Sequence, residues 1–223
     1  MRKTLFNLPN EVKFCKICVM SNQKPYSVVE TKHSYERKNA KYMKFNSNGI
    51  CSACQINKLS NKINWKSREK QLLRLLDKFR SGTKKFDCLV PGSGGKDSAM
   101  VAHLLKYKYG MNPLTCTWAP HIYTDWGWKN HQAWIHAGFD NILFTPNGLV
   151  HRLLTRVALE KLFHPFQPFM LGQKNFPPKL AYLYDIPLIF YGENEAEYGN
   201  EKNNVNDSSR STNFFSGKNT DNF

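Results

Sequence analysis

Residues 90–98, with the sequence VPGSGGKDS, have the composition of a loop that holds an anion. Glycines let a backbone approach phosphate oxygens, and a helix that begins after them offers N–H groups and the positive end of its dipole. A Walker A loop is excluded, because its first glycine would fall at Val90 and Lys96 is followed by Asp97 rather than Ser or Thr. A dinucleotide fingerprint is excluded because Asp97 stands where its third glycine belongs. The segment therefore predicts a phosphate-binding loop of another kind.

Four of the six cysteines form two Cys-x-x-Cys pairs. Cys15 pairs with Cys18 and Cys51 with Cys54, and 32 residues separate the two pairs. Four thiolates in tetrahedral geometry make a closed structural zinc site, with no position left open for catalysis. Redox thiols or an iron–sulfur cluster are the alternative uses of such cysteines.

The other two cysteines, Cys88 and Cys116, lie inside apolar segments, where a thiol usually behaves as a small buried hydrophobe. A disulfide scaffold is not expected, because the N-terminal segment does not read as an export signal and cytosolic thiols stay reduced. Metal binding and burial are thus the predicted uses of the six thiols.

A polar and aromatic segment at residues 117–130 follows a predicted strand at the end where open α/β sheets bind ligands. Within it, Thr124 and Asp125 could contact adenine, ribose or an acceptor. The same two residues could instead cap the next helix.

A second such segment, residues 191–199 with the sequence YGENEAEYG, follows the last predicted strand. Its three glutamates at alternate positions could bind magnesium, position ammonia or solvate a loop. We select Gly192, Glu193 and Asn194 as candidate nucleotide contacts.

The spacing of apolar residues predicts alternating strands and helices that would position these segments. Strands are expected at residues 86–90, 114–118, 141–145 and 187–191, and helices at 67–80, 97–109, 127–137, near 149–157 and at 177–184. Pro177 and Pro178 are expected to open the last helix. The helix near 149–157 is expected to turn five residues inward: Leu149, Val150, Leu153, Leu154 and Val157. Such alternation predicts an α/β fold, a Rossmann-like, doubly wound parallel sheet with helices on both faces.

Composition divides the chain of 223 residues unevenly. Residues 1–85 hold 20 Lys and Arg against 5 Asp and Glu, whereas residues 86–223 hold 12 basic and 12 acidic residues. The net charge of +15 is therefore carried by residues 1–85. We expect a basic zinc-knuckle domain at 1–64, a linking helix at 65–85, a nucleotide domain at 86–198 and a polar tail at 199–223. No run approaches the roughly 18 apolar residues of a membrane span, and a cytoplasmic protein is expected.

The loop Ser-Gly-Gly-Lys-Asp-Ser at residues 93–98 resembles that of the PP-loop ATP pyrophosphatases. Three further features accompany this loop: the cysteine pairs, Phe-Thr-Pro-Asn-Gly at 144–148 and Gly-Glu-Asn-x-Ala-Glu-Tyr-Gly at 192–199. With all of them, the chain resembles a narrower family, the N-acetyl sugar amidotransferases of surface-polysaccharide and flagellin-glycan biosynthesis. Members of that family continue well beyond the Gly-Glu-Asn region, so a nucleotide domain shortened at its C-terminus is expected.

The resemblance implies that ATP, Mg²⁺ and structural Zn²⁺ are the cofactors. Ser93, Gly94, Gly95 and Ser98 would bind pyrophosphate, Lys96 would neutralise its charge, and Asp97 would lie near magnesium or the loop backbone. Lys96 and Asp97 are thus the candidate catalytic residues. The acetamido oxygen of an N-acetylated, nucleotide-activated or sialic-acid-like sugar would attack the α-phosphate of ATP, and ammonia would then displace AMP to leave an acetamidino group.

Ammonia needs a source, and no cysteine in the chain is expected to serve a built-in glutaminase. A separate glutaminase with a cyclase-like companion is implied as partner. Two rival functions stay open: a PP-loop tRNA thiolase or other RNA-modifying enzyme, which the basic front favours, and a non-catalytic ATP-binding module. A third Cys-x-x-Cys pair, common in such thiolases, is missing, so a nucleic-acid partner is not expected.

Overall fold

The computed structural model describes residues 8–24, 42–82, 85–193 and 215. The chain divides into two compact units, with the boundary between Arg68 and Glu69. In the described part of the chain, no helix is both long and apolar enough to cross a membrane.

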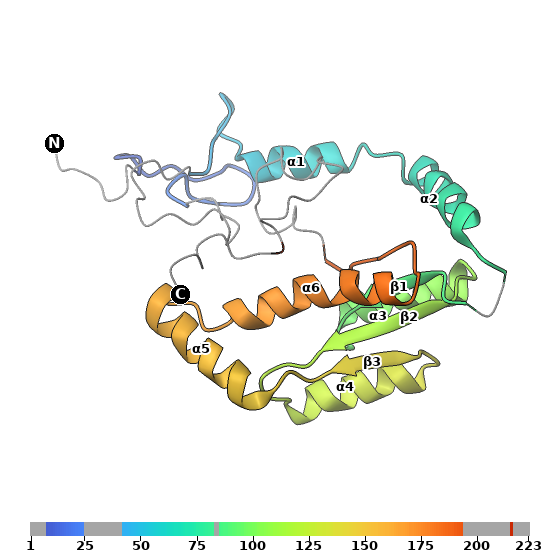
Figure 1. Cartoon of the computed structure of the whole chain (residues 1–223). Helices are drawn as coiled ribbons and strands as arrows, with labels where there is room; N and C mark the ends of the chain where they lie inside the picture. The colour runs from blue at the N-terminus through green and yellow to red at the C-terminus, as the bar shows by residue number, and fades with distance from the viewer. Residues whose placement is uncertain (1–7, 25–41, 83–84, 194–214, 216–223) are drawn as a thin grey trace. The chain divides into compact units, whose positions relative to one another are not determined.

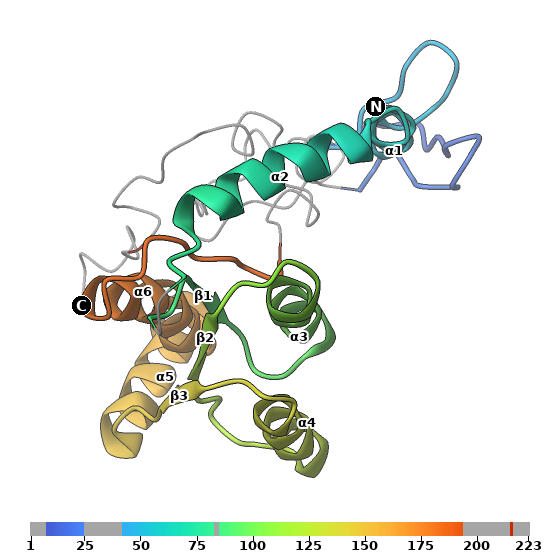
Figure 2. The same ribbon diagram turned by 90° about the vertical axis from the view of Figure 1, so that its right-hand side faces the viewer.

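The second unit is built on a parallel sheet of three strands in the order β1-β2-β3. The strands are β1 (Cys88–Pro91), β2 (Pro113–Trp118) and β3 (Asn141–Phe144), and Leu89 of β1 lies opposite Leu114 of β2. The helices α3 (Lys96–His103) and α4 (Asp125–His136) cover one face of the sheet, and α5 (Gly148–Leu162) and α6 (Gln167–Leu183) lie on the other (Figure 2). The predicted α/β fold with a parallel sheet is confirmed.

β1 and β2 are buried on both faces along almost their whole length, whereas β3, at the edge of the sheet, is partly exposed. Cys88 and Val90 of β1 pack in a cluster with Ala102 of α3 and Trp134 of α4. Alternate residues point the other way, and Leu89 packs with β2 and α6 residues. A core on each face holds the carboxyl ends of the strands, and the loops that follow them, in fixed positions.

After α6 the chain returns to β1 and pairs with it through a single bridge, in the place of a fourth strand. Ile189 forms a parallel bridge with Leu89, whose N–H donates to the Leu188 carbonyl at 2.8 Å. The expected strand at 187–191 is thus reduced to a single bridge. Because β1 is followed by a helix on one face and the returning segment arrives from the other, the carboxyl end of β1 is a topological switch point, where open α/β sheets bind ligands.

Two helices of this unit differ from their predicted form. The helix expected at 67–80 is α2 (Trp65–Phe79), and its start is capped by Asn64, whose Oδ1 accepts from the N–H of Ser67 at 3.0 Å. The helix expected at 97–109 is α3 followed by a π-helical turn, η4 (Leu104–Lys108), in which Tyr109 N–H donates to the Leu104 carbonyl.

The prediction for α5 is wrong in its orientation. Leu149 is 70% exposed and Leu153 60% exposed, whereas His151 and Ala158 are buried. The inward face of α5 therefore carries polar as well as small side chains, and hydrophobicity alone assigned the wrong face.

The prediction that Pro177 and Pro178 open a helix is also wrong. Both lie inside α6, which starts ten residues earlier at Gln167. Pro177 is fully buried, and Leu180 and Ala181 of the same helix pack against the sheet. Tertiary packing of this face outweighs the unfavourable position of proline in a helix interior.

The first unit contains one described helix of its own, α1 (Ser52–Ser60), and very little core. Short antiparallel bridges join Phe14 to Ser21 and Phe45 to Cys51. Figure 1 shows the blue loops of this unit that precede α1. The described buried cluster of the unit consists of Cys15, Met43 and Cys51. Such a small cluster buries too little apolar surface to hold a fold unaided.

Candidate functional site

The loop at residues 92–95 leaves β1 and enters α3 at the carboxyl edge of the sheet. Gly92 N–H donates to the Cys116 carbonyl of β2 at 2.9 Å, which fixes the start of the loop. A Cβ at Gly92 would lie 2.3 Å from the Ser98 side chain. The glycine is therefore required for the loop to close over the first turn of α3.

Gly94 lies at the turn of the loop with φ +82°, in the left-handed region that favours glycine. A Cβ there would lie 2.7 Å from the Asn130 carbonyl oxygen of α4. The loop is thus held against α4 as well as α3.

The N-terminus of α3 is arranged to meet an anion. Gly95 is its N-cap and makes no side-chain cap, and Ser98 is buried with its Oγ donating to the Gly95 carbonyl at 3.2 Å. The side chains of Lys96 and Asp97 are 91% and 48% exposed, with Nζ and Oδ1 3.8 Å apart. A loose, exposed ion pair of this kind contributes little to stability, so both groups are available to a ligand. An uncapped helix N-terminus beside glycines binds phosphate groups.

The segment after Ile189 meets the same helix turn. A Cβ at Gly192 would lie 2.6 Å from Ser98 N and 2.8 Å from the carbonyl carbon of Asp97. Two candidate segments almost 100 residues apart are therefore brought together. Glu193 is exposed beside Gly192, and Asn194 lies outside the described residues.

Thr124 serves as the N-cap of α4, and its Oγ1 accepts from Gly127 N–H at 3.0 Å. Asp125 is exposed in the first turn of the same helix, where a carboxylate interacts favourably with the helix dipole. The capping role considered for these residues is thus present in the structure, and their contact with a nucleotide stays a prediction.

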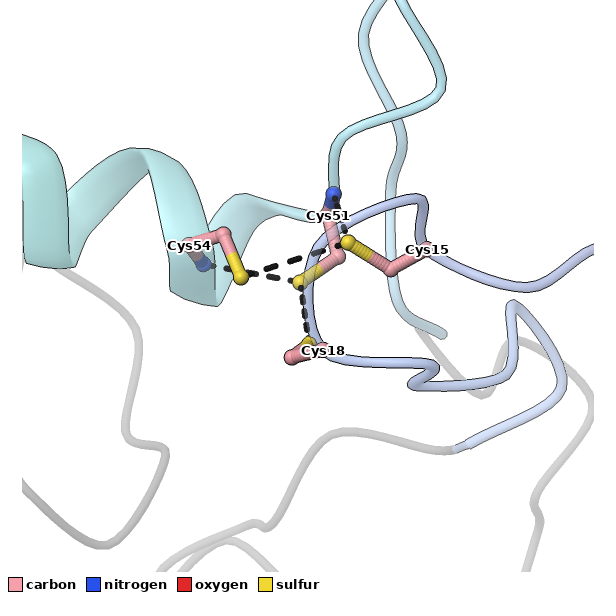
Figure 3. A group of neighbouring side chains, drawn as sticks. All are labelled: Cys15, Cys18, Cys51 and Cys54. Atoms are coloured by element: carbon pink, nitrogen blue, oxygen red, sulfur yellow. Dashed lines mark hydrogen bonds between the residues drawn. The ribbon is translucent and has the colours of Figure 1, made fainter.

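The four paired cysteines converge in the first unit (Figure 3). Their sulfur atoms all lie within 4.8 Å of one another, with Cys15 and Cys54 3.9 Å apart and Cys18 and Cys51 3.6 Å apart. These separations exceed the S–S bond of about 2.05 Å and approach the spacing of about 3.8 Å between sulfurs on one tetrahedral zinc ion. The donor set and its geometry fit zinc.

Backbone N–H groups donate to two of these sulfurs, and those on Cys15 favour its charged form. Cys51 is the N-cap of α1 and its sulfur accepts from Cys54 N–H, while Cys15 sulfur accepts from Cys51 N–H at 3.3 Å. The Cys51 N–H is the main cause that lowers the pKa of Cys15 to about 6, whereas the neighbouring Cys18 side chain raises the pKa of Cys54 to about 12. Four thiolates so close together need a cation to offset their repulsion, and a zinc ion would supply that charge.

Cys88 and Cys116 are fully buried in β1 and β2. Burial is the main cause that raises the pKa of each thiol to about 12. Neither has the thiolate character of a nucleophile.

Sequence reasoning gave no role to a histidine pair at the same edge of the sheet. His121, in the loop after β2, stacks on His151 of α5 with ring centroids 4.3 Å apart. The two residues are 30 positions apart and share no spacing motif, so only the fold reveals them.

No protein-family model matches the chain, and no curated protein matches it. Among solved structures, the ammonia-dependent NAD synthetase of Campylobacter jejuni, in complex with the nitrate ion, is similar with a TM-score of 0.47 and 13% sequence identity. The match covers 60% of this chain and 59% of that one, so the chain spans about three fifths of the length of that protein.

Proposed function

We propose that the protein is an ATP-dependent amidotransferase that converts the N-acetyl group of a sugar to an acetamidino group, with release of AMP and pyrophosphate. The observation that carries the proposal is the loop at residues 92–95, which joins β1 to an uncapped α3 at the switch point of the sheet. The sequence of this loop resembles the pyrophosphate-binding loop of the PP-loop enzymes, and its place in the fold suits a triphosphate.

An acetamido oxygen is a poor leaving group, and this defines what the site has to do. The oxygen attacks the α-phosphate of ATP, which gives an adenylylated imidate and pyrophosphate. Ammonia then displaces AMP. The protein supplies no nucleophile, and its contribution is to orient the reactants and stabilise the charge that develops on pyrophosphate.

Each loop residue has a distinct part in that charge stabilisation. Backbone N–H groups of Gly94, Gly95 and Ser98 and the hydroxyl group of Ser93 bind pyrophosphate, and Lys96 offsets its negative charge. Asp97, in the first turn of α3, would hold the magnesium that accompanies ATP. Magnesium, when bound, withdraws charge from the phosphate oxygens.

Ammonia comes from a separate glutaminase in this proposal. The support is that four cysteines converge on a metal-type cluster and the other two are buried thiols with raised pKa values. A glutaminase needs an accessible, activated thiol, which none of the six provides.

The test is the position at which ATP is cleaved. The protein is incubated with ATP, magnesium, ammonium chloride and each of UDP-N-acetylglucosamine, UDP-N-acetylgalactosamine and N-acetylneuraminic acid, and the products are identified by mass spectrometry. We expect AMP, pyrophosphate and a sugar heavier by one ammonia and lighter by one water. ADP as the nucleotide product would contradict the mechanism.

A matched pair of variants ties that activity to the loop. Asp97→Ala should lower AMP release by a factor on the order of 10² or more, as does the loss of single groups that contact transition-state charge. Asp77→Ala removes an exposed carboxylate in α2 that pairs with Arg80, and should leave the rate unchanged. Equal rates for Asp97→Ala and the unaltered protein would remove the loop from the mechanism.

A further inference from the structure

The histidine pair lies at the same edge of the sheet as the phosphate loop. Gly92 N–H is bonded to Cys116 of β2, and His121 follows five residues after Cys116 in the loop that leaves β2. β1 and β2 are adjacent and parallel, so the loops after them leave the same edge of the sheet. His121 and the loop at residues 92–95 therefore lie at the edge of the sheet where open α/β folds bind ligands.

Hydrogen bonds fix which nitrogen of His121 carries its proton. The Thr155 hydroxyl donates to the His151 carbonyl at 2.7 Å, so its proton is already used. Thr155 Oγ1 also lies 3.0 Å from His121 Nε2 and can only accept there, so Nε2 carries the proton. The neutral ring then has its lone pair on Nδ1, and within the described residues no hydrogen bond engages that atom. A base oriented by a second group has the arrangement of a general base.

The described neighbours of His121 come from two helices. α5 presents His151 and Thr155 to it, and the start of α6 presents the rings of Phe166 and Phe169. Among these described neighbours only His151 titrates, and burial followed by the nearby His121 lowers the pKa of His151. The stacked ring therefore takes up a proton less readily than an exposed histidine. His121 itself is exposed and can return the proton to water.

We propose that His121, held by Thr155, is the general base for the amidation half of the reaction. Ammonia forms a C–N bond to the imidate carbon, and one of its protons passes to Nδ1 of His121. The C–O bond to AMP then breaks, with its electron pair leaving on the phosphate oxygen of AMP. This inference rests on the proposed function, and it assigns the loop after β2 to the acceptor side of the site.

The experiment separates the two halves of the reaction. Adenylylation is measured without ammonia, as the acceptor-dependent exchange of labelled pyrophosphate into ATP, and amidation as acetamidino sugar formed after ammonium chloride is added. The acceptor is whichever of the three N-acetylated sugars above supports exchange. In His121→Gln the amide still donates to Thr155 but lacks a basic nitrogen. We expect its exchange to stay within about twofold and its amidation to fall by a factor on the order of 10², the usual contribution of a general base.

Two further variants complete the test. His136→Gln removes an exposed histidine at the end of α4 and should change neither half. In His121→Ala, added imidazole should restore amidation, which a merely structural role would not allow. Amidation at the unaltered rate in His121→Gln, or an equal loss of both halves without rescue, overturns this role while leaving the proposed function standing. Absence of exchange in the unaltered protein overturns both.

Discussion

Gly192 shows how closely the segment after the returning bridge approaches the first turn of α3. In Gly192→Ala the new methyl group would lie 2.6 Å from Ser98 N, a backbone atom that can move only with α3. Overpacking of this kind costs about 1–3 kcal/mol, so we expect the affinity for ATP to fall by roughly tenfold, measured by calorimetric titration.

Gly148→Ala is the matched control for that substitution. Gly148 opens α5, and nothing lies within 4 Å of its missing Cβ. Unaltered ATP affinity in both variants would show that Gly192 does not shape the nucleotide site.

Candidate site residues could be selected from the sequence where the groups that act together are close to one another in the chain. Ser93 to Ser98 are consecutive, and each cysteine pair is local, so spacing alone indicated an anion loop and a metal cluster. His121 and His151 meet only because β2 and α5 are brought together by the fold. The proximity of Gly192 to Ser98 was unforeseen for the same reason.

At the scale of elements, the cysteine knuckle should depend on its metal. Cys18 is exposed, so Cys18→Ser removes a sulfur ligand while leaving packing almost unchanged. We expect loss of zinc, measured by elemental analysis, and faster amide exchange in residues 8–24 and 42–54, because the buried cluster there is so small. Amides of β1 and β2 should stay protected.

Cys88→Ala serves as the control, since that thiol lies in β1 and should leave the zinc content at one per chain. Freshly purified, untagged protein that contains no zinc would contradict the assignment.

α5 should make stability sensitive to mild acid through His151. The pKa of His151 is lowered from 6.5, mainly by burial and then by His121, so the folded chain binds this proton less readily than the unfolded chain. The contribution of neutral His151 to the free energy of unfolding is fully present above pH 6.5 and is lost as the pH falls through the folded-state pKa. We therefore expect urea unfolding to show a lower free energy of unfolding at pH 5.5 than at pH 7.5.

His151→Gln should reduce that difference, whereas His136→Gln should retain it. An unchanged pH dependence in His151→Gln would show that His151 is not the responsible group.

The helices and strands of residues 65–183 were predictable in kind and order, whereas α1 was not predicted and the strand expected at 187–191 is a single bridge. The misassigned features have physical causes. Apolar spacing located α5, but it could not show that His151 and Thr155 face the protein while Leu149 and Leu153 face outward. Local proline rules failed at Pro177 because packing of α6 against the sheet dominates.

At the scale of the whole molecule, the charge of +15 allows a test between the proposed function and an RNA-modifying one. If the acceptor is a sugar, binding to tRNA in a gel-shift assay should be weak at physiological salt and should fall steeply as salt rises, because it rests on nonspecific phosphate contacts. Binding to total RNA of equal length should weaken in parallel. Salt-resistant binding that selects tRNA would favour an RNA-modifying enzyme.

The pairing of Leu89 with Ile189 has a consequence for synthesis of the chain on the ribosome. The outer side of β1 meets its partner only 100 residues after β1 has been made, which at roughly 5–20 residues per second is a delay of about 5–20 s. During that interval β1 and β2 can pair, but β1 presents an open edge to solvent and to neighbouring nascent chains. The sheet beside β1 is thus completed late in translation, and the nascent intermediate with its open edge is exposed to aggregation.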